Sequence, residues 1–241
     1  PAPGNTILDM GCATGTLAVP LARAGHHVHA CDFAEAMLTI LDQRAAAENL
    51  PITSHLLAWD EDWSQAGLGE NSVDLAFASR SLMSDHTLSR IAKLDAAARV
   101  KAAVVVPNSL PPSSDPRLLT YLGHKAKRPS TVPEVIRALR YLGRTPVTAT
   151  TNTFRPMRFN SFEEARDDLR RLARPEPFTA REQRLFDAYA RDHFVEVPAV
   201  PPANGLSNDH GDSPQTQWVL NYPLPVVWTF IGWRTDGSEW E

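Results

Sequence analysis

The sequence predicts an α/β fold, in which a mainly parallel sheet is covered on both faces by helices. Short apolar runs alternate with helix-forming segments over roughly the first hundred residues, the pattern of parallel strands joined by crossover helices. The apolar runs are nearly continuous, as expected for strands that are buried on both faces. Apolar residues make up 43% of the 241 residues, so the chain has enough of them for a large core.

The first half of the chain alternates strand and helix in a regular way. Strands are expected over 6–10, 27–31, 52–57, 73–78 and 102–106, and helices over 14–24, 34–49 and 87–98. The first helix carries Leu17 and Leu21 at helical spacing and ends before Gly25. Glycine favours such an end because it readily adopts the left-handed backbone that follows a helix.

The second half is less regular. Residues 108–116 are rich in proline and serine and predict a loop. Capping-box patterns predict helices that begin near Thr131, Ser161 and Thr179. One or two strands are expected over 147–159, a loop over 198–214, and a strand pair or one bent strand over 217–233.

The composition excludes some classes of partner. The formal net charge of -4 and the sequence pI of about 6.1 indicate no basic surface for nucleic acid. No apolar run approaches the ~20 residues that span a bilayer, so no membrane partner is expected. Cys12 and Cys31 fall in elements that are predicted to be buried, which suits a protein of the reduced cytoplasm.

The most informative segment is the turn between the first strand and its helix, Asp9-Met-Gly11-Cys-Ala-Thr-Gly15. Gly11 and Gly15 permit unusual backbone angles and let the chain pass close to a ligand. The helix that follows points its N-terminal amides at that ligand. Asp32 follows the second strand, where an acid can accept hydrogen bonds from both ribose hydroxyls. Together these features predict an adenosine-binding site.

The turn differs from the dinucleotide fingerprint G-x-G-x-x-G. Starting at Gly11, that fingerprint needs glycine at positions 13 and 16, where this chain has Ala13 and Thr16. Asp9 also places a negative charge where a pyrophosphate would approach. The same charge is complementary to the amino group and the sulfonium of S-adenosylmethionine, so charge favours that cofactor over a dinucleotide.

Residues 6–38 resemble the first two motifs of the class I S-adenosylmethionine-dependent methyltransferases. In that family an acid, any residue and G-x-G-x-G precede a second acid, which closes the second strand. Gly11 and Gly15 match, Ala13 replaces the middle glycine, and the segment from Asp32 to Leu38 is typical. The resemblance covers residues 5–107. It implies a Rossmann-like fold with a mostly parallel seven-stranded sheet and a helical insertion before the last strand or strands.

The resemblance also implies how the chain is divided. Residues 1–107 would be the cofactor-binding half, 108–160 a linker, a helix and later strands, 161–215 a helical insertion and loop that cap the substrate, and 216–234 the closing strand or strands of the sheet. Domains of this kind often carry a helix before the first strand, which begins here near Asn5. We therefore expect that residues before Pro1 are missing from this chain.

The family pattern assigns roles to single residues. Asp9 would hold the cofactor's amino group, and Gly11 and Gly15 would lie against its methionine portion. Asp32 would bind the ribose, and Phe33 would flank the adenine. The expected product of the cofactor is S-adenosylhomocysteine.

Further cofactor contacts are expected after the third strand. Asp60 would accept a hydrogen bond from the adenine amine and Trp59 would stack on the ring, with Asp62 as an equally suitable acid. The remaining residues that the resemblance places at the cofactor are Cys12, Ala13, Met37 and Ser79.

Two residues near the end of the fourth strand are candidates for catalysis. Arg80 can clamp a substrate carboxylate or phosphate with its two-pronged donor geometry; alternatively, it braces Asp85 or a backbone carbonyl. His86 can take a proton from the acceptor; alternatively, it packs at the start of a helix. A base is needed only if the acceptor carries a proton at the working pH.

Absent motifs favour a small-molecule acceptor, which is anionic if Arg80 binds it. Residues 79–82 stand where enzymes that methylate exocyclic amines carry (Asn/Asp)-Pro-Pro-(Tyr/Phe), and neither cysteine fills the place of a cytosine nucleophile. Aromatic residues of the second half are candidate pocket walls or core residues: Tyr121, Tyr189, Trp218 and Tyr222.

No metal site is expected. His26, His27 and His29 are close in sequence, but no cysteine or acid completes a ligand set beside them. His210 lies in a polar loop, which is either a lid or a mobile loop. Two other functions stay open, an NAD(P)-dependent oxidoreductase and a protein that binds the cofactor without catalysis. The chain is expected to be a cytoplasmic monomer or homodimer.

Overall fold

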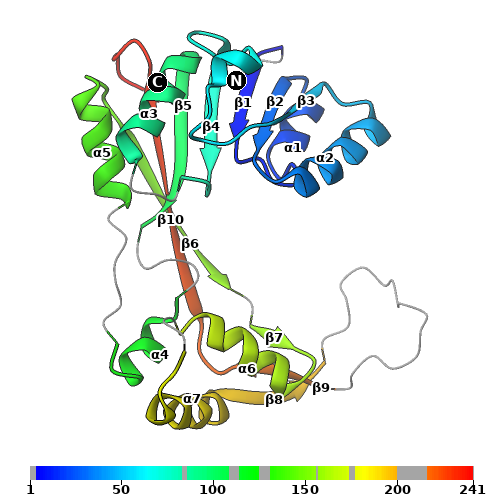
Figure 1. The fold of residues 1–241 in the computed structure, drawn as a ribbon, viewed down its shortest axis with the longest axis vertical. Helices are drawn as coiled ribbons and strands as arrows, with labels where there is room; N and C mark the ends of the chain where they lie inside the picture. Colours follow the sequence, from blue (N-terminus) through cyan, green and yellow to red (C-terminus); the bar gives the residue numbers. More distant parts are fainter. Residues whose placement is uncertain are drawn as a thin grey trace. The chain divides into compact units, whose positions relative to one another are not determined.

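A computed structural model describes residues 4–82, 86–108, 114–124, 131–155, 157–173, 177–199 and 216–240. The chain divides into two units (Figure 1). The first contains Pro1–Asn108, Ser130–Thr151 and Trp228–Glu241, and the second contains Ser109–Pro129 and Asn152–Val227.

The first unit is built on a seven-stranded sheet with the order β3-β2-β1-β4-β5-β10-β6. Its strands are β1 (Thr6–Met10), β2 (His27–Asp32), β3 (Ile52–Leu56), β4 (Val73–Ser79), β5 (Ala98–Pro107), β6 (Val147–Arg155) and β10 (Leu224–Arg234). The first five strands pair in parallel, whereas β10 is antiparallel to β5. The expected mostly parallel seven-stranded sheet is confirmed.

Helices lie on both faces of this sheet. The helices are α1 (Ala18–Arg23), α2 (Glu35–Glu48), α3 (Thr87–Ala97) and α5 (Thr131–Tyr141). α1 and α2 pack on β2 and β3, and α3 and α5 pack on β4 and β5 (Figure 1). Leu41 belongs to the core beneath α1 and α2, while Leu94 and Trp233 belong to the core beneath α3 and α5.

The strand order reverses between β1 and β4. From β1 the chain adds β2 and β3 on one side, and then crosses back to add β4 and β5 on the other side. In parallel sheets such a reversal leaves a crevice at the carboxyl ends of the two central strands, and ligands bind there. The fold therefore points to the residues that follow Met10 and Ser79.

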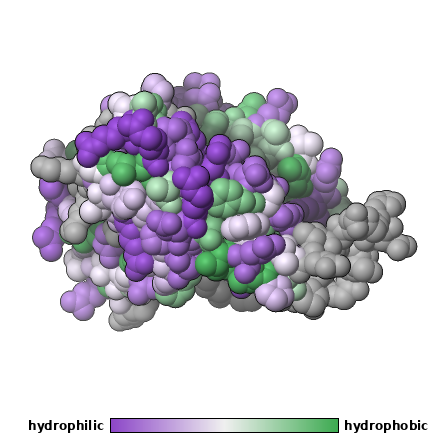
Figure 2. Space-filling view, turned by 90° about the horizontal axis from the view of Figure 1, so that it is seen from below, coloured by the Kyte–Doolittle hydropathy of each residue, from purple (hydrophilic) through white to green (hydrophobic). Residues whose placement is uncertain are grey.

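The second unit has a three-stranded antiparallel sheet with the order β7-β9-β8. Its elements are α4 (Pro116–Tyr121), β7 (Arg158–Phe159), α6 (Phe162–Arg171), α7 (Ala180–His193), β8 (Phe194–Pro198) and β9 (Thr216–Leu220). Ser161 caps α6 and Thr179 caps α7, as the capping boxes predict. The face that carries α7 is largely hydrophilic with scattered apolar residues (Figure 2), as suits amphipathic helices that are exposed to water on one side.

A buried carboxylate organises the core of the second unit. Asp115 is 0% exposed and accepts hydrogen bonds from the backbone N–H groups of Arg117 and Leu118 and from the Tyr222 hydroxyl. The Tyr222 and Tyr189 hydroxyls lie 2.8 Å apart. Burial raises the pKa of the Tyr222 hydroxyl, so it stays protonated. Both tyrosines are core residues of this unit.

Several segments differ from expectation, beginning with α1, which starts at Ala18 rather than at Thr14. Residues 216–234 do not all close the main sheet: β10 joins it, but β9 pairs with β7 and β8. The reason is that Trp218 packs on Phe162, with ring centres 5.0 Å apart, in the core of the second unit. α4 and β8 were not predicted. Nothing in the described ranges is a helix long and apolar enough to cross a membrane.

Candidate functional site

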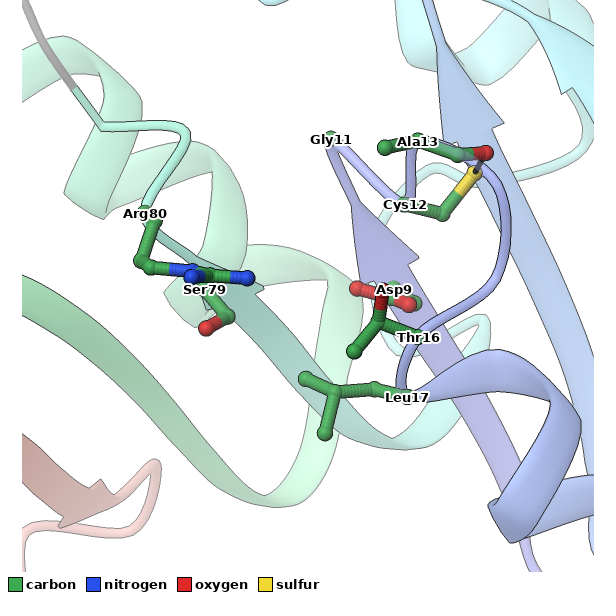
Figure 3. Close-up of a pocket in the computed structure, with 8 residues that line it drawn as sticks. All are labelled: Asp9, Gly11, Cys12, Ala13, Thr16, Leu17, Ser79 and Arg80. Carbon is green, nitrogen blue, oxygen red and sulfur yellow. Dashed lines mark hydrogen bonds between the residues drawn. The ribbon is translucent and has the colours of Figure 1, made fainter. Parts of the chain in front are cut away.

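A cavity of about 390 Å³ lies at the reversal point of the sheet (Figure 3). Its walls come from the end of β1, the glycine turn and the end of β4. The lining residues are Asp9, Gly11, Cys12, Ala13, Thr16, Leu17, Ser79 and Arg80. Of these, Thr16 and Leu17 were not expected as site residues. The sequence analysis considered Thr16 only as a position where the dinucleotide fingerprint requires glycine. Its position in the turn also indicated a site residue.

The two glycines of the turn are required by the packing of the chain on itself. Gly11 has a φ of +80°, and a Cβ there would come within 2.2 Å of the Ser81 Cβ. Gly15 has a φ of +84°, and a Cβ there would come within 2.4 Å of the Leu41 Cδ1. Gly15 therefore packs under α2 and is not among the lining residues. The turn can hold its shape only without side chains at these positions.

Asp32 stabilises the glycine turn through hydrogen bonds to its carboxylate. This carboxylate is 7% exposed, and it accepts hydrogen bonds from the Ala13 N–H at 2.8 Å and from the Ala34 N–H at 2.9 Å. It therefore ties the glycine turn to the start of α2. Each oxygen has a further lone pair, so Asp32 can brace the turn and accept ribose hydroxyls as well.

Ala13, which replaces the family's middle glycine, has a left-handed backbone with a φ of 47°. This conformation costs an L-residue with a Cβ ~1–2 kcal/mol. Replacing Ala13 with glycine removes that strain, whereas the extra freedom of glycine in the unfolded chain costs only ~0.4–1 kcal/mol. We expect Ala13→Gly to raise the free energy of unfolding by about 0.5 kcal/mol in urea denaturation.

The matched control for that change is Ala46, which is exposed within α2. Because its backbone is helical, Ala46→Gly should lower the free energy of unfolding by ~1 kcal/mol. Equal losses in both variants would mean that the turn does not strain Ala13.

Asp9 forms the buried floor of the cavity. It is 2% exposed, and burial, together with the nearby Asp32 carboxylate, raises its pKa to about 7, although a hydrogen bond from the Ala18 backbone N–H lowers it. The backbone N–H at the start of α1 thus favours the ionised form of this carboxylate. A phosphate group at this position would meet that carboxylate, whereas a cation would stabilise it.

Arg80 stands on the opposite wall. It has a left-handed backbone with a φ of 60°, its N–H donates to the Val105 carbonyl at 2.9 Å, and its guanidinium lies 5.6 Å from the centre of the Trp228 ring. Figure 3 shows the Arg80 side chain extending in the direction of Asp9. Asp85, the alternative partner of Arg80, lies outside the described residues.

The other expected cofactor residues are not part of this cavity. Phe33 is 77% exposed and Met37 is 40% exposed, both beside the start of α2. Asp60 pairs with Arg90 at 3.1 Å, so its carboxylate is engaged in an ion pair. His86 immediately precedes α3 and is not among the lining residues.

The loop after β3 is fastened to α3. The Lys93 Nζ donates to the Trp59 and Glu61 carbonyls, each at 2.8 Å. Trp59 is buried against Trp63, with ring centres 5.5 Å apart. The Trp59 Nε1 is buried and has no hydrogen-bond partner within the described part of the chain. Asp62 caps the short helix Trp63–Ala66 by accepting from the Ser64 N–H.

Cysteine and histidine chemistry is limited at this end of the sheet. Burial raises the pKa of the Cys12 thiol well above its usual range, so it stays protonated and is a poor nucleophile.

The His29 Nδ1 and His55 Nε2 lie 3.1 Å apart on neighbouring strands, a pair that the sequence analysis did not identify. Among the described residues, no group of three or more His, Cys, Asp or Glu is disposed to hold a metal ion. His210 lies outside them.

Comparisons with known proteins find similarity to methyltransferases in sequence and in fold. Residues 7–103 match the family described as methyltransferase domain. An uncharacterized protein of Haemophilus influenzae is 37% identical over 95 residues, which are 39% of this chain and 34% of that relative. The match thus spans about a third of that relative's length.

Solved structures share the fold at low sequence identity. The YcgJ protein of Bacillus subtilis has a TM-score of 0.56 at 11% identity, covering 96% of this chain and 92% of that chain. A geranyl diphosphate methyltransferase, solved with its substrate and sinefungin, has a TM-score of 0.52 at 14% identity, covering 98% of this chain and 72% of that chain. Residues 7–103 are therefore similar in sequence to a methyltransferase domain, and the chain shares the fold of these solved structures.

Proposed function

We propose that this chain transfers the methyl group of S-adenosylmethionine to a small-molecule acceptor. The observation that carries the proposal is the cavity at the reversal point of the sheet, whose floor is a buried carboxylate. A buried acid with a raised pKa favours a cationic ligand, because a positive charge offsets the cost of ionising it. The cofactor's ammonium and sulfonium groups are such charges.

The residues of the cavity suit this cofactor. When bound, S-adenosylmethionine supplies an electrophilic methyl group and a thioether leaving group. The tasks of the protein are then to align the acceptor with that methyl group and to exclude water. Asp9 would hold the ammonium, Asp32 would keep the turn in shape and bind the ribose, and Ser79 would border the methyl group.

An NAD(P)-dependent oxidoreductase is disfavoured by the same geometry. Dinucleotide sites present free amides at the start of the first helix to the pyrophosphate. Here the Asp9 carboxylate, which is 2% exposed, lines the cavity where the pyrophosphate would bind, and its negative charge opposes one. Calorimetry should therefore detect binding of S-adenosylhomocysteine but not of NADH or NADPH.

Catalysis is tested by incubating the protein with isotope-labelled S-adenosylmethionine and a metabolite extract, and then identifying labelled products by mass. A labelled small molecule is the expected result. Binding of S-adenosylhomocysteine without any labelled product from extracts of several sources would instead indicate a protein that binds the cofactor without catalysis.

The proposal of a small-molecule acceptor rests on the charge of the chain and on proteins of similar fold. The net charge of -4 does not favour binding to nucleic acid. Two proteins of similar fold are named as methyltransferases of geranyl diphosphate and of magnesium protoporphyrin IX. Both cysteines are free thiols, which supports a reducing, cytoplasmic location.

The raised pKa of Asp9 makes cofactor affinity depend on pH. The ionised carboxylate is the form that binds a cation, and about half of it is protonated near pH 7. We therefore expect the affinity for S-adenosylmethionine to fall by up to about tenfold per pH unit below pH 7, where the cofactor's ammonium stays protonated and Asp9 gains its proton. Titration calorimetry from about pH 5.5 to about pH 7.5 measures this change.

The matched variant is Asp9→Asn, which removes the titrating group and nearly preserves its size. It should bind the cofactor more weakly, with an affinity that stays flat over the same pH range. A flat profile for the unmodified protein would show that Asp9 does not face the cofactor's cationic groups.

A further inference from the structure

Arg80 is the permanent cation among the residues that line the cavity. A guanidinium stays protonated in proteins. The left-handed backbone at Arg80 and the stack on Trp228 hold it at the wall opposite Asp9. Strained backbone that persists in a non-glycine residue is concentrated at functional sites. The arrangement therefore calls for an anion that faces Arg80.

The charges of the proposed cofactor restrict that anion. The sulfonium and the ammonium of S-adenosylmethionine are both positive, so a guanidinium in the same cavity is unfavourable unless it faces a negative group. The one anion that the cofactor carries is the carboxylate of its methionine portion. With Asp9 on one wall and Arg80 on the other, the cavity is complementary to a zwitterionic amino acid.

We infer that Arg80 binds the α-carboxylate of the cofactor and that Trp228 positions the guanidinium for this contact. The inference rests on the proposed function, and it replaces the sequence-based expectation that Arg80 clamps an acceptor anion. A guanidinium stacked on an aromatic ring keeps its N–H groups at its edge, where they bind a carboxylate in a bidentate way. The site thereby selects nucleosides that carry an amino-acid group.

Two ligands test the inference by binding alone. S-adenosylhomocysteine carries the amino-acid group, whereas 5′-methylthioadenosine is the same type of nucleoside thioether without it. We expect Arg80→Ala and Arg80→Gln to weaken the binding of S-adenosylhomocysteine at least tenfold and to change the affinity for 5′-methylthioadenosine less than twofold. Trp228→Leu should weaken the binding of S-adenosylhomocysteine by a smaller factor, since it removes the aromatic contact that positions the guanidinium but keeps the charge of Arg80.

The control is Arg140→Ala, which removes the same charge from an exposed position on α5 and should leave both affinities unchanged. Thermal unfolding of each variant confirms that it is folded. Unchanged S-adenosylhomocysteine affinity in Arg80→Ala and Arg80→Gln would overturn the inference, as would an equal loss for both ligands. Failure of the unmodified protein to bind S-adenosylhomocysteine would overturn the proposed function itself.

Discussion

Replacing Asp32 with alanine is expected to weaken S-adenosylhomocysteine binding by at least ~1.5 kcal/mol, more than tenfold in affinity. The variant loses the carboxylate that accepts the Ala13 and Ala34 N–H groups, and hydrogen bonds to a charged group contribute ~1.5–3 kcal/mol each. The glycine turn then loses its tie to α2, and under the proposed function the ribose loses its acceptor. Calorimetry measures the affinity, and urea denaturation measures the loss of stability.

A matched carboxylate at the opposite edge of the same sheet, at the start of β4, separates binding from stability. Asp74 accepts hydrogen bonds from the Thr6 N–H and hydroxyl and pairs with Arg99 at 2.8 Å. Asp74→Ala should therefore lower the free energy of unfolding but leave cofactor affinity unchanged. If both variants bind S-adenosylhomocysteine like the unmodified chain, Asp32 has no part in the site.

Gly11→Ala is expected to lower the free energy of unfolding by at least ~2 kcal/mol and to abolish measurable cofactor binding. A left-handed backbone costs alanine ~1–2 kcal/mol, and overpacking adds to that cost. The added Cβ would stand 2.2 Å from the Ser81 Cβ and 2.6 Å from its Oγ. The turn must therefore shift away from the end of β4, and the cavity between them changes shape.

Gly67 provides the control for the strain of a left-handed backbone without a steric clash. Its φ is +75°, and a Cβ there meets nothing within 4 Å. Gly67→Ala should thus show the strain of a left-handed alanine without the clash, and it should bind the cofactor normally. Adding Ser81→Gly to Gly11→Ala should restore part of the lost stability. Equal losses for Gly11→Ala and Gly67→Ala would argue against the contact with Ser81.

Local sequence signals predicted the first unit well because each of its elements is specified by nearby residues. Continuous apolar runs mark buried parallel strands, and the acid-and-glycine pattern that begins at Asp9 marks the turn. The functions of these residues within the fold were less predictable. That Gly11 makes room for Ser81 and that Asp32 binds the Ala13 N–H depend on contacts between segments far apart in sequence.

The second unit was predicted less completely for related reasons. Asp115 followed by Pro116 is a helix-start signal, but the proline-rich context favoured a loop. The alternation in Phe194–Pro198 is that of a strand, but it directly follows a helix with no intervening breaker. The placement of β9 depends on Trp218 packing against Phe162, a choice between two sheets that no local pattern encodes.

The hydrogen bond from the Ser81 Oγ to the Met10 carbonyl, at 2.6 Å, has a mechanical consequence. It latches the segment that leaves β4 onto the segment that leaves β1, directly beside the point where Gly11 leaves room for Ser81. A shift of either segment is therefore opposed unless the other moves with it or this hydrogen bond breaks. The two walls of the crevice are coupled through this contact without any hinge between them.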